Sequence, residues 1–441
     1  MAIIMKFGGS SVKTAERIRN VCSIIESRKE QNPVVVVSAV GGITDLLIDT
    51  ATLAKDGGDV TSAIADIKQR HKDILSELRL DGKLVDGLLT EIEQVIGDIK
   101  ARLVADTAVM DVVQSFGERL SSVIIAANLV QRGVVAKACV AWDYGMITTP
   151  AYGNAEPIPS SFALMKEKIE AVEGIPVITG FIGKDEKGAI TTLGRGGSDY
   201  TAALYGAALD VSEIQIWTDV DGILSADPRV IPNAKRHTTV SFDEASELAF
   251  FGAKVLHPKT ILPAVKQCIP VRVLNTFNPS CEGTVITREG ARTLDIVKAI
   301  SCKKDVSIVT IHSTRMLNAH GFLAKVFEVF ACNKKSVDIV ATSEVSVSMT
   351  VDSGESLADI LAELNEIAET KVTNGKAIVC VVGEGMKHTK GLAGRIFSTL
   401  GKAGINIEVI SQGGSEINIS MVVDGRDAEK AVKALHGEFF N

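Results

Sequence analysis

The sequence lacks the features that mark membrane, secreted and nucleic-acid-binding proteins. Among its 441 residues no apolar run reaches bilayer-spanning length, and no charged stretch precedes the first apolar residues. There is no block of Lys and Arg, and the net charge is −7. The seven cysteines show no C-x-x-C spacing, which is typical of reduced thiols rather than a disulfide or zinc framework. We therefore expect a cytoplasmic protein without membrane or nucleic-acid partners.

Several catalytic signatures are also missing. Lys6-Phe7-Gly8-Gly9 is not a Walker A loop because the lysine precedes the glycines, and neither G-x-S-x-G nor a His–Glu metal helix occurs. No conspicuous Ser–His or Cys–His pair is present, which favours an acceptor that needs no deprotonation. A carboxylate, with a pKa of about 3.9, is such an acceptor at pH 7. Phosphoryl transfer to a carboxylate remains, with catalysis by positioning and electrostatics.

One glycine-rich stretch stands out, from Thr191 to Thr201. It follows a short apolar run and precedes a helical pattern, so it predicts a strand, a turn and a helix start. Its glycines allow close approach by a ligand, and the free N–H groups of a helix start attract anions. Ser198 and Asp199 sit where helix N-caps sit, and Arg195 offers a planar fork for a carboxylate or phosphate. The stretch therefore predicts a ligand site.

Strands and helices alternate over the first 275 residues, which favours a parallel α/β sheet. Strands are predicted at 3–5, 34–37, 134–140, 176–179, 189–192, 214–217 and 271–274, and mostly helix from 60 to 131. Lys6, Ser38, Phe181 and Asp219 each follow a strand end, where ligands of such sheets bind. Gly117, beside Glu118 inside a helix, indicates a close approach by another segment.

The last third contains an internal repeat. The segment Gly321–Phe327 matches Gly391–Phe397, and Ser348–Asp352 matches Ser420–Asp424. Each copy predicts a strand, a helix and two strands. Two such units favour side-by-side sheets that bind a small effector.

Together the motifs resemble the aspartokinases. The matching stretches are 6–12, 192–202, 217–222, 227–229 and 251–258. The resemblance implies an α/β amino-acid-kinase fold, with a mostly parallel sheet between helix layers, at 1–290. Two ACT-type ferredoxin-like α+β regulatory domains are then expected at 305–375 and 376–441, with strand exchange between them allowed.

The resemblance also implies ATP-dependent phosphorylation of the side-chain carboxylate of L-aspartate, with Mg²⁺ carried by the nucleotide and no protein-bound metal. The implied catalytic residues are Lys6, Asp199, Asp219 and Lys254. The implied aspartate-binding residues are Ser38, Thr44, Glu118, Phe181, Arg195 and Ser198. The implied nucleotide-binding residues are Lys6, Gly8, Gly9, Ser10, Thr218, Asp219, Leu224, Arg229, Lys254 and Val255.

Within the family the chain looks most like the monofunctional, lysine-sensitive type. The positions that correspond to its lysine site are Met316, Phe322, Leu323, Ser336, Val337, Asp338, Ser343 and Glu344. Carboxylates such as Asp338 and Glu344 are what the ε-ammonium of lysine needs when it is buried. The resemblance further implies a homodimer through the ACT domains, or a dimer of such dimers.

Two alternatives stay open at this point. One is another amino-acid kinase, of the acetylglutamate or glutamate 5-kinase type, which the ACT repeat and the Glu118/Arg195 pair disfavour. The other is a non-catalytic ACT amino-acid sensor with a decayed kinase domain, which four intact residues disfavour, namely Lys6, Asp199, Asp219 and Lys254.

Overall fold

The computed structural model describes residues 2–250, 258–290, 296–313, 316, 320–353, 357–413 and 417–440. The chain forms two compact units. The N-terminal unit comprises Met1–Ile223, Thr238–Phe242 and Val255–Gly290, and the C-terminal unit comprises Leu224–His237, Asp243–Lys254 and Ala291–Asn441. Two segments within the range 1–290 thus belong by their packing to the C-terminal unit.

The N-terminal unit is built on an eight-stranded sheet. Its strands, in spatial order, are β3 (Ala136–Cys139), β5 (Ile175–Thr179), β2 (Pro33–Val37), β1 (Ile3–Phe7), β8 (Glu213–Thr218), β10 (Val271–Asn275), β11 (Thr284–Thr287) and β9 (Thr239–Ser241). All neighbours run parallel except β10 and β11. Every residue of β1 and β2 is buried, as expected for strands covered on both faces. The mostly parallel sheet was correctly predicted.

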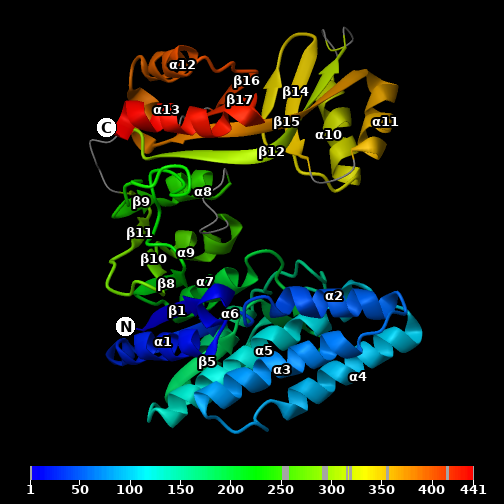
Figure 1. Ribbon diagram of the computed structural model, residues 1–441, viewed down its shortest axis with the longest axis vertical. Helices are drawn as coiled ribbons and strands as arrows, with labels where there is room; N and C mark the ends of the chain where they lie inside the picture. Colours follow the sequence, from blue (N-terminus) through cyan, green and yellow to red (C-terminus); the bar gives the residue numbers. More distant parts are fainter. Residues whose placement is uncertain are drawn as a thin grey trace. The chain divides into compact units, whose positions relative to one another are not determined.

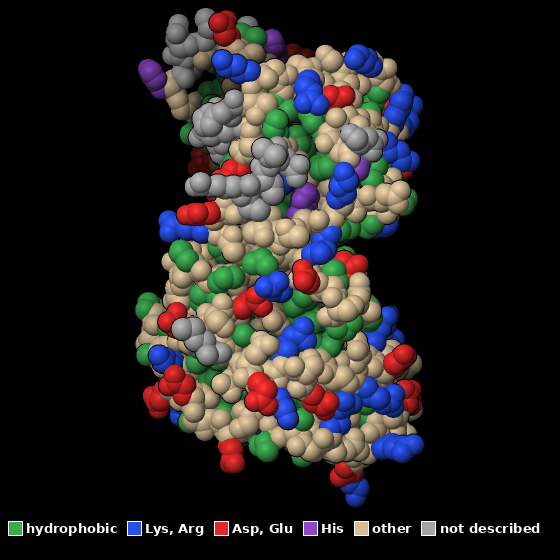
Figure 2. Space-filling model, turned by 90° about the vertical axis from the view of Figure 1, so that its left-hand side faces the viewer, with side chains coloured by type: hydrophobic (Ala, Val, Ile, Leu, Met, Phe, Trp, Pro, Cys, Tyr) green, Lys and Arg blue, Asp and Glu red, His purple; other side chains and the backbone are tan. Residues whose placement is uncertain are grey.

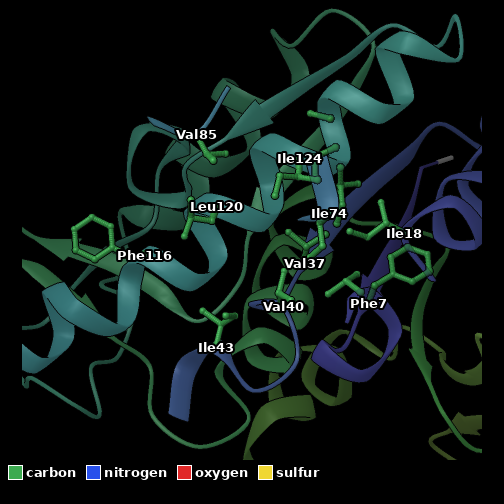
Figure 3. Packing of buried hydrophobic residues seen from close by; sticks show 14 of the residues in the cluster. Phe7, Ile18, Val37, Val40, Ile43, Ile74, Val85, Phe116, Leu120 and Ile124 are labelled. Carbon is green, nitrogen blue, oxygen red and sulfur yellow. The ribbon is translucent and has the colours of Figure 1, made fainter. Parts of the chain in front are cut away.

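Helices cover both faces of this sheet. The large helical layer contains α1 (Ala15–Glu26), α2 (Ile43–Lys55), α3 (Thr61–Leu78), α4 (Asp86–Arg102) and α5 (Thr107–Gln131), several of which lie alongside one another (Figure 1). Phe7 and Val37 of the sheet join Ile18, Ile74 and Ile124 of these helices in one core (Figure 3). The other helices of the unit are α6 (Ser161–Glu170), α7 (Gly197–Leu209) and α9 (Leu262–Gln267).

Side chains alternate along β1, and this alternation sets the direction of Lys6. Ile3, Met5 and Phe7 belong to the core beneath α1 to α5. Ile4 points the other way, because a Cβ added at Gly206 of α7 would lie 3.5 Å from its Cγ1. Since neighbouring side chains in a strand point to opposite faces, Lys6 projects toward α7 as well.

The predicted strand at 189–192 forms, but in a separate small sheet. This sheet has the order β4 (Ile147–Thr148), β6 (Ile182–Asp185) and β7 (Ile190–Thr192). β6 and β7 pair antiparallel as a tight hairpin, which is too short to cross over to the parallel sheet. The glycine-rich turn therefore leaves from this hairpin.

The C-terminal unit has one six-stranded antiparallel sheet. Its strands, in spatial order, are β13 (Val340–Thr342), β14 (Ser346–Asp352), β12 (Ala299–His312), β15 (Glu369–Val382), β17 (Asn418–Asp424) and β16 (Val409–Gln412). Its helices are α8 (Phe242–Phe250), α10 (Phe322–Cys332), α11 (Ala358–Ile367), α12 (Leu392–Lys402) and α13 (Ala428–Phe440). Each repeat copy follows the predicted order of strand, helix, strand and strand.

The two longest strands run through both halves of this sheet. Ile300, near the start of β12, packs in one core with Leu392 and Leu435, whereas Ile311, near its end, packs in another with Val326. β12 and β15 pair along most of their length, with irregular register between Lys303 and Ile308. β12, the first strand of the first repeat, thus contributes side chains to the cores of both repeats.

None of the described helices combines the length and apolarity that a bilayer crossing needs. On the face shown in Figure 2, acidic and basic side chains are interspersed over the surface of the N-terminal unit.

Candidate active site

The turns after β1 and β2 lie against each other at the carboxyl ends of their strands. A Cβ added at Gly9 would lie 3.0 Å from the Ala39 carbonyl oxygen, and one at Gly41 would lie 2.9 Å from the Gly9 oxygen. The Ser38 N–H donates to the Phe7 carbonyl at 3.1 Å. These two turns form part of a cavity of about 760 Å³ at this edge of the sheet.

Lys6 reaches this cavity and pairs with Asp199. Its Nζ lies 2.6 Å from Oδ1 of Asp199, and the two side chains are only 11% and 14% exposed. The alternation along β1 explains the meeting, because Asp199 stands in the first turn of α7. The pair holds a lysine charge, largely shielded from water, at the cavity wall.

The start of α7 differs in detail from the prediction. The cap position is occupied by Gly196, in the left-handed region with φ of 70°, and no side chain in the described part of the chain caps the helix. Ser198 and Asp199 therefore lie in the first turn, so the expectation that they cap the helix is wrong. The reason is that the glycine takes the cap conformation without strain, which leaves the Asp199 carboxylate available to Lys6.

Close packing joins the turn after β5 to the start of α7. A Cβ added at Gly180 would lie 2.6 Å from Ser198, and one at Gly197 would lie 2.5 Å from the Phe181 ring. Phe181 has a positive φ of 70°, and its N–H donates to Oγ1 of Thr201 at 2.9 Å. The ring of Phe181 is thereby held at the cavity wall.

Glu118 of α5 is a buried carboxyl group, 4% exposed, that lines the cavity. The close approach predicted at Gly117 is made by Ala39, whose Cβ would lie 2.6 Å from a Cβ at that position. The Ala39 N–H donates to Oε1 of Glu118 at 3.1 Å, while Oε2 has no partner among the described residues. Burial raises the pKa of Glu118 to about 8, although the Ala39 bond opposes this. An incoming cation would satisfy the open oxygen.

Arg195 is the opposite case, an exposed cation at the same cavity. Gly194 and Gly196 flank it with φ of 75° and 70°, so a left-handed glycine stands on each side. Its guanidinium makes no hydrogen bond or ion pair with any residue in the described ranges. The cavity is lined by all six predicted aspartate-binding residues, namely Ser38, Thr44, Glu118, Phe181, Arg195 and Ser198.

The predicted nucleotide-binding residues are distributed differently. The Gly8 N–H donates to the Trp217 carbonyl at 3.3 Å, which brings the turn of Gly8, Gly9 and Ser10 beside the end of β8. Thr218 and Asp219 follow there, and the Thr218 hydroxyl donates to the Asp219 carboxylate at 3.1 Å. Lys254 and Val255 lie outside the described residues.

Leu224 and Arg229 belong to the C-terminal unit by their packing. Leu224 bridges to Arg236, and Arg229 pairs at 2.6 Å with Asp227. The cavity of the N-terminal unit therefore contains neither of them among its lining residues.

Asp111 is a buried carboxylate that the sequence analysis missed. It accepts hydrogen bonds from the N–H groups of Gly153 and Thr192 and from the Thr192 hydroxyl. The available signal was its spacing, because Asp111 precedes Glu118 by seven residues and so shares its helix face.

The predicted effector residues divide between the core and the surface of the first repeat. Met316, Phe322 and Val337 pack against its core, Leu323 is 39% exposed, and Ser336, Ser343 and Glu344 are exposed. Asp338 is different, because its carboxylate lies 2.8 Å from Nζ of Lys303. The same Lys303 reaches Asp352 at 2.9 Å, so Asp338 already has a cation partner within the chain.

Comparison with known proteins places this architecture. Residues 1–275 match the amino acid kinase family, and residues 379–439 match an ACT domain. The chain is 40% identical to the chloroplastic aspartokinase 1 of Arabidopsis thaliana, over 99% of this chain and 80% of that protein. It is 36% identical to the lysine-sensitive aspartokinase 3 of Escherichia coli, over 99% of each. This chain belongs to the aspartokinases.

Solved aspartokinase structures share the fold. E. coli aspartokinase III in complex with aspartate and ADP, in the R-state, has a TM-score of 0.86 at 35% identity and full coverage of both chains. The same enzyme with lysine and aspartate, in the T-state, has a TM-score of 0.83. The predicted family and the predicted fold class are thereby confirmed.

Proposed function

We propose that this aspartokinase transfers the γ-phosphoryl group of ATP to the side-chain carboxylate of L-aspartate, which yields 4-phospho-L-aspartate. One observation carries the proposal: a single cavity presents the Lys6–Asp199 pair together with an oxygen of buried Glu118 and the guanidinium of Arg195, neither of which has a partner among the residues that the structure describes. Relatives named aspartokinase, and a related structure that holds aspartate and ADP, support the assignment.

The two open charges match an amino acid in its zwitterionic form. The Arg195 fork binds the α-carboxylate, and Glu118 accepts a hydrogen bond from the α-ammonium. Thr44, Ser38 and Ser198 supply short polar side chains around them, and Phe181 closes one wall. The side-chain carboxylate of aspartate then faces Lys6.

Lys6 stabilises charge on the transferring phosphoryl group, and Asp199 orients its ammonium. No general base is needed because the acceptor is already ionised. The nucleotide lies over the turn of Gly8, Gly9 and Ser10, where backbone N–H groups suit phosphate. The remaining proposed nucleotide contacts are Thr218, Asp219, Leu224, Arg229, Lys254 and Val255. Mg²⁺ that accompanies the nucleotide supplies further positive charge at the phosphates.

We further propose that L-lysine inhibits the enzyme through the first ACT repeat, at the residues assigned above from Met316 to Glu344. The proposed assembly is a homodimer through the ACT repeats, and the proposed location is the cytoplasm. The exposed Glu344 is open to an effector, and the exposed Ser343 beside it already shares its hydroxyl with Ser346. The structure of the related enzyme with lysine and aspartate supports this assignment.

An assay of ADP release over a panel of acids tests the proposed activity. L-aspartate, N-acetylglutamate and L-glutamate are each supplied with ATP and Mg²⁺, and the acyl phosphate is trapped as a hydroxamate. We expect turnover with aspartate alone. Turnover with only one of the other acids would favour a different amino-acid kinase, and no turnover with any acid would favour a sensor.

A further inference from the structure

We propose that Asp111 is a positioning residue for the substrate: it fixes the turn that carries Arg195 from behind the cavity. The proposal rests on the proposed function, because it takes Arg195 as the group that binds aspartate. Asp111 is 0% exposed, and it is not among the residues that line the cavity. Its effect on a substrate therefore has to pass through the segments that it holds.

Two segments meet at this carboxylate. Oδ2 of Asp111 accepts the N–H of Thr192 and the N–H of Gly153, both at 2.9 Å, and Oδ1 accepts the Thr192 hydroxyl at 2.7 Å. Thr192 is the last residue of β7, three residues before Arg195. Gly153 belongs to a loop that is separate in sequence from both β7 and α5. One side chain thus ties a helix, a strand end and a loop together.

The loop in turn supports the turn itself. A Cβ added at Gly194 would lie 3.0 Å from the Gly153 carbonyl oxygen and 3.0 Å from the Asn154 side chain. The Ala155 N–H also donates to the Thr192 carbonyl at 2.9 Å. The backbone just before Arg195 is therefore supported by the end of β7 and by the loop at Gly153, and Asp111 accepts hydrogen bonds from both.

The position of Asp111 in α5 adds a second link. Gln114 and Glu118 follow it by three and seven residues, and both line the cavity. Residues at this spacing share one face of a helix. Asp111 thereby sets the distance between the helix that bears the anionic group and the turn that bears the cationic one. These two groups, Glu118 and Arg195, are the ones proposed to bind the α-ammonium and the α-carboxylate of aspartate.

A catalytic role does not fit this carboxylate. Both of its oxygens accept hydrogen bonds from the chain, and the side chain is fully buried. Removal of the carboxylate would leave the buried Thr192 N–H and the partly buried Gly153 N–H without their acceptor, which the turn can relieve only by moving. Since a misplacement of about 1 Å can cost about 10²-fold in a bound reaction geometry, the effect should be large and specific.

The test compares Asp111→Ala with Asp111→Asn in the full chain. In the asparagine variant one oxygen can still accept both N–H groups, and the amide can donate to the Thr192 hydroxyl. We expect Asp111→Ala to raise the aspartate KM by about tenfold or more. The ATP KM should stay within about twofold, and Asp111→Asn should restore most of the aspartate affinity. Equal rises in both KM values, or an asparagine variant as impaired as the alanine variant, would overturn the proposal.

The same hairpin offers a matched control. Asp185, 6% exposed, accepts the N–H groups of Lys187 and Ala189 at the other end of the β6–β7 hairpin. Asp185→Ala removes a similar carboxylate from similar bonds. We expect a lower midpoint of thermal unfolding with an unchanged aspartate KM. A comparable rise in aspartate KM in this variant would show that any loosening of the hairpin suffices.

A double-mutant cycle with Arg195→Ala tests the route of the effect. If Asp111 acts through Arg195, Asp111→Ala should raise the aspartate KM of the Arg195→Ala enzyme by no more than about twofold. Fully additive effects would refute the route while leaving Arg195 in the substrate site. An unchanged aspartate KM in Arg195→Ala alone would instead refute the proposed function. If Asp111→Ala does not fold, Thr192→Val serves in its place in the cycle, because it removes only the hydroxyl bond.

Discussion

Two buried carboxyl groups, one in each unit, are treated by the fold in opposite ways. Glu118 in the N-terminal unit has one oxygen bound to the Ala39 N–H and the other without a partner among the described residues. Asp338 in the C-terminal unit is closed by Lys303, which also reaches Asp352. A buried polar atom that lacks a partner is costly and therefore indicates a ligand, whereas a paired charge indicates structure.

The internal repeat supports this interpretation of Asp338. In the second copy Nζ of Lys376 lies 2.6 Å from Glu408 and 3.6 Å from Asp424. The backbone agrees as well, because the Asp338 N–H donates to the Thr350 carbonyl and the Glu408 N–H donates to the Val422 carbonyl. A lysine between two carboxylates is thus a shared feature of both copies. Because Asp338 already pairs with Lys303, the exposed Glu344 is the more accessible of the two carboxylates proposed to bind the effector.

The largest effect is expected from the open cation of the kinase cavity. Arg195→Ala should raise the aspartate KM by about 30-fold to 4,000-fold, because truncation of one partner of a buried, hydrogen-bonded charge pair costs about 2–5 kcal/mol. Steady-state kinetics with each substrate varied in turn measures the effect, and the ATP KM should be nearly unchanged. An unchanged aspartate KM would show that Arg195 lies outside the substrate site. It would also contradict the inference that a group without a partner in the chain marks a ligand site.

Lys6→Ala should act on the other kinetic constant. A charge beside the transferring phosphoryl group matters most in the transition state, so kcat should fall by about 10²–10³-fold with little change in aspartate KM. Because the variant also leaves Asp199 without its partner, Asp199→Asn in the same assay separates loss of the lysine charge from loss of the pair. A change in KM alone would make Lys6 a ground-state binder.

The regulatory unit should show a smaller effect that separates its two carboxylates. Glu344→Ala and Asp338→Ala should each weaken lysine inhibition, within the 5–150-fold range of typical coupling. Only Asp338→Ala should also lower the midpoint of thermal unfolding, since it strips Lys303 of a buried partner. Inhibition curves with lysine and threonine, together with thermal unfolding, measure both. Lysine inhibition that survives both substitutions would place the effector elsewhere.

The sequence predicted what depends on local chemistry and missed what depends on packing between distant segments. The parallel strands, the glycine turns and the close approach at Gly117 could all be predicted because each leaves a local pattern. The spacing of Asp111 from Glu118 was a usable signal, but its hydrogen-bond partners could not be predicted, because they lie 42 and 81 residues away. The pairing of Asp338 with Lys303 was missed for the same reason, since it joins β12 to the loop before β13.

The assignment of residues to the two units was also beyond the sequence. Leu224–His237 and Asp243–Lys254 lie between strands of the kinase sheet in sequence, yet they pack with the C-terminal unit. Ser225 shows why, because its side chain pairs with His436 at 3.0 Å and its carbonyl accepts the Ile300 N–H at 2.8 Å. No change in composition and no linker in the sequence indicates that these two segments pack with the C-terminal unit.

The smallest effect concerns the pH dependence that the open carboxyl group confers. Because the pKa of Glu118 is raised to about 8 in the ligand-free protein, the group is mostly protonated at pH 7. The α-ammonium of aspartate favours the ionised form, so binding must release a proton below pH 8. The apparent affinity for aspartate should therefore rise by up to about tenfold per pH unit from pH 6 to pH 8, and then level off.

The same shift has the opposite consequence for the ligand-free fold. A carboxyl group that ionises less readily when folded stabilises the native state fully below its unfolded pKa of 4.5 and loses that contribution as pH rises through about 8. Calorimetric titration with aspartate, in two buffers of different ionisation enthalpy, counts the released protons directly. Glu118→Gln should release none, bind aspartate weakly at every pH and flatten the loss of thermal stability between pH 5 and pH 8. Proton release that persists in this variant would assign the titrating group to another residue. The unpaired oxygen of Glu118 would then not be the group that receives the α-ammonium, and its contrast with the paired Asp338 would carry no functional meaning.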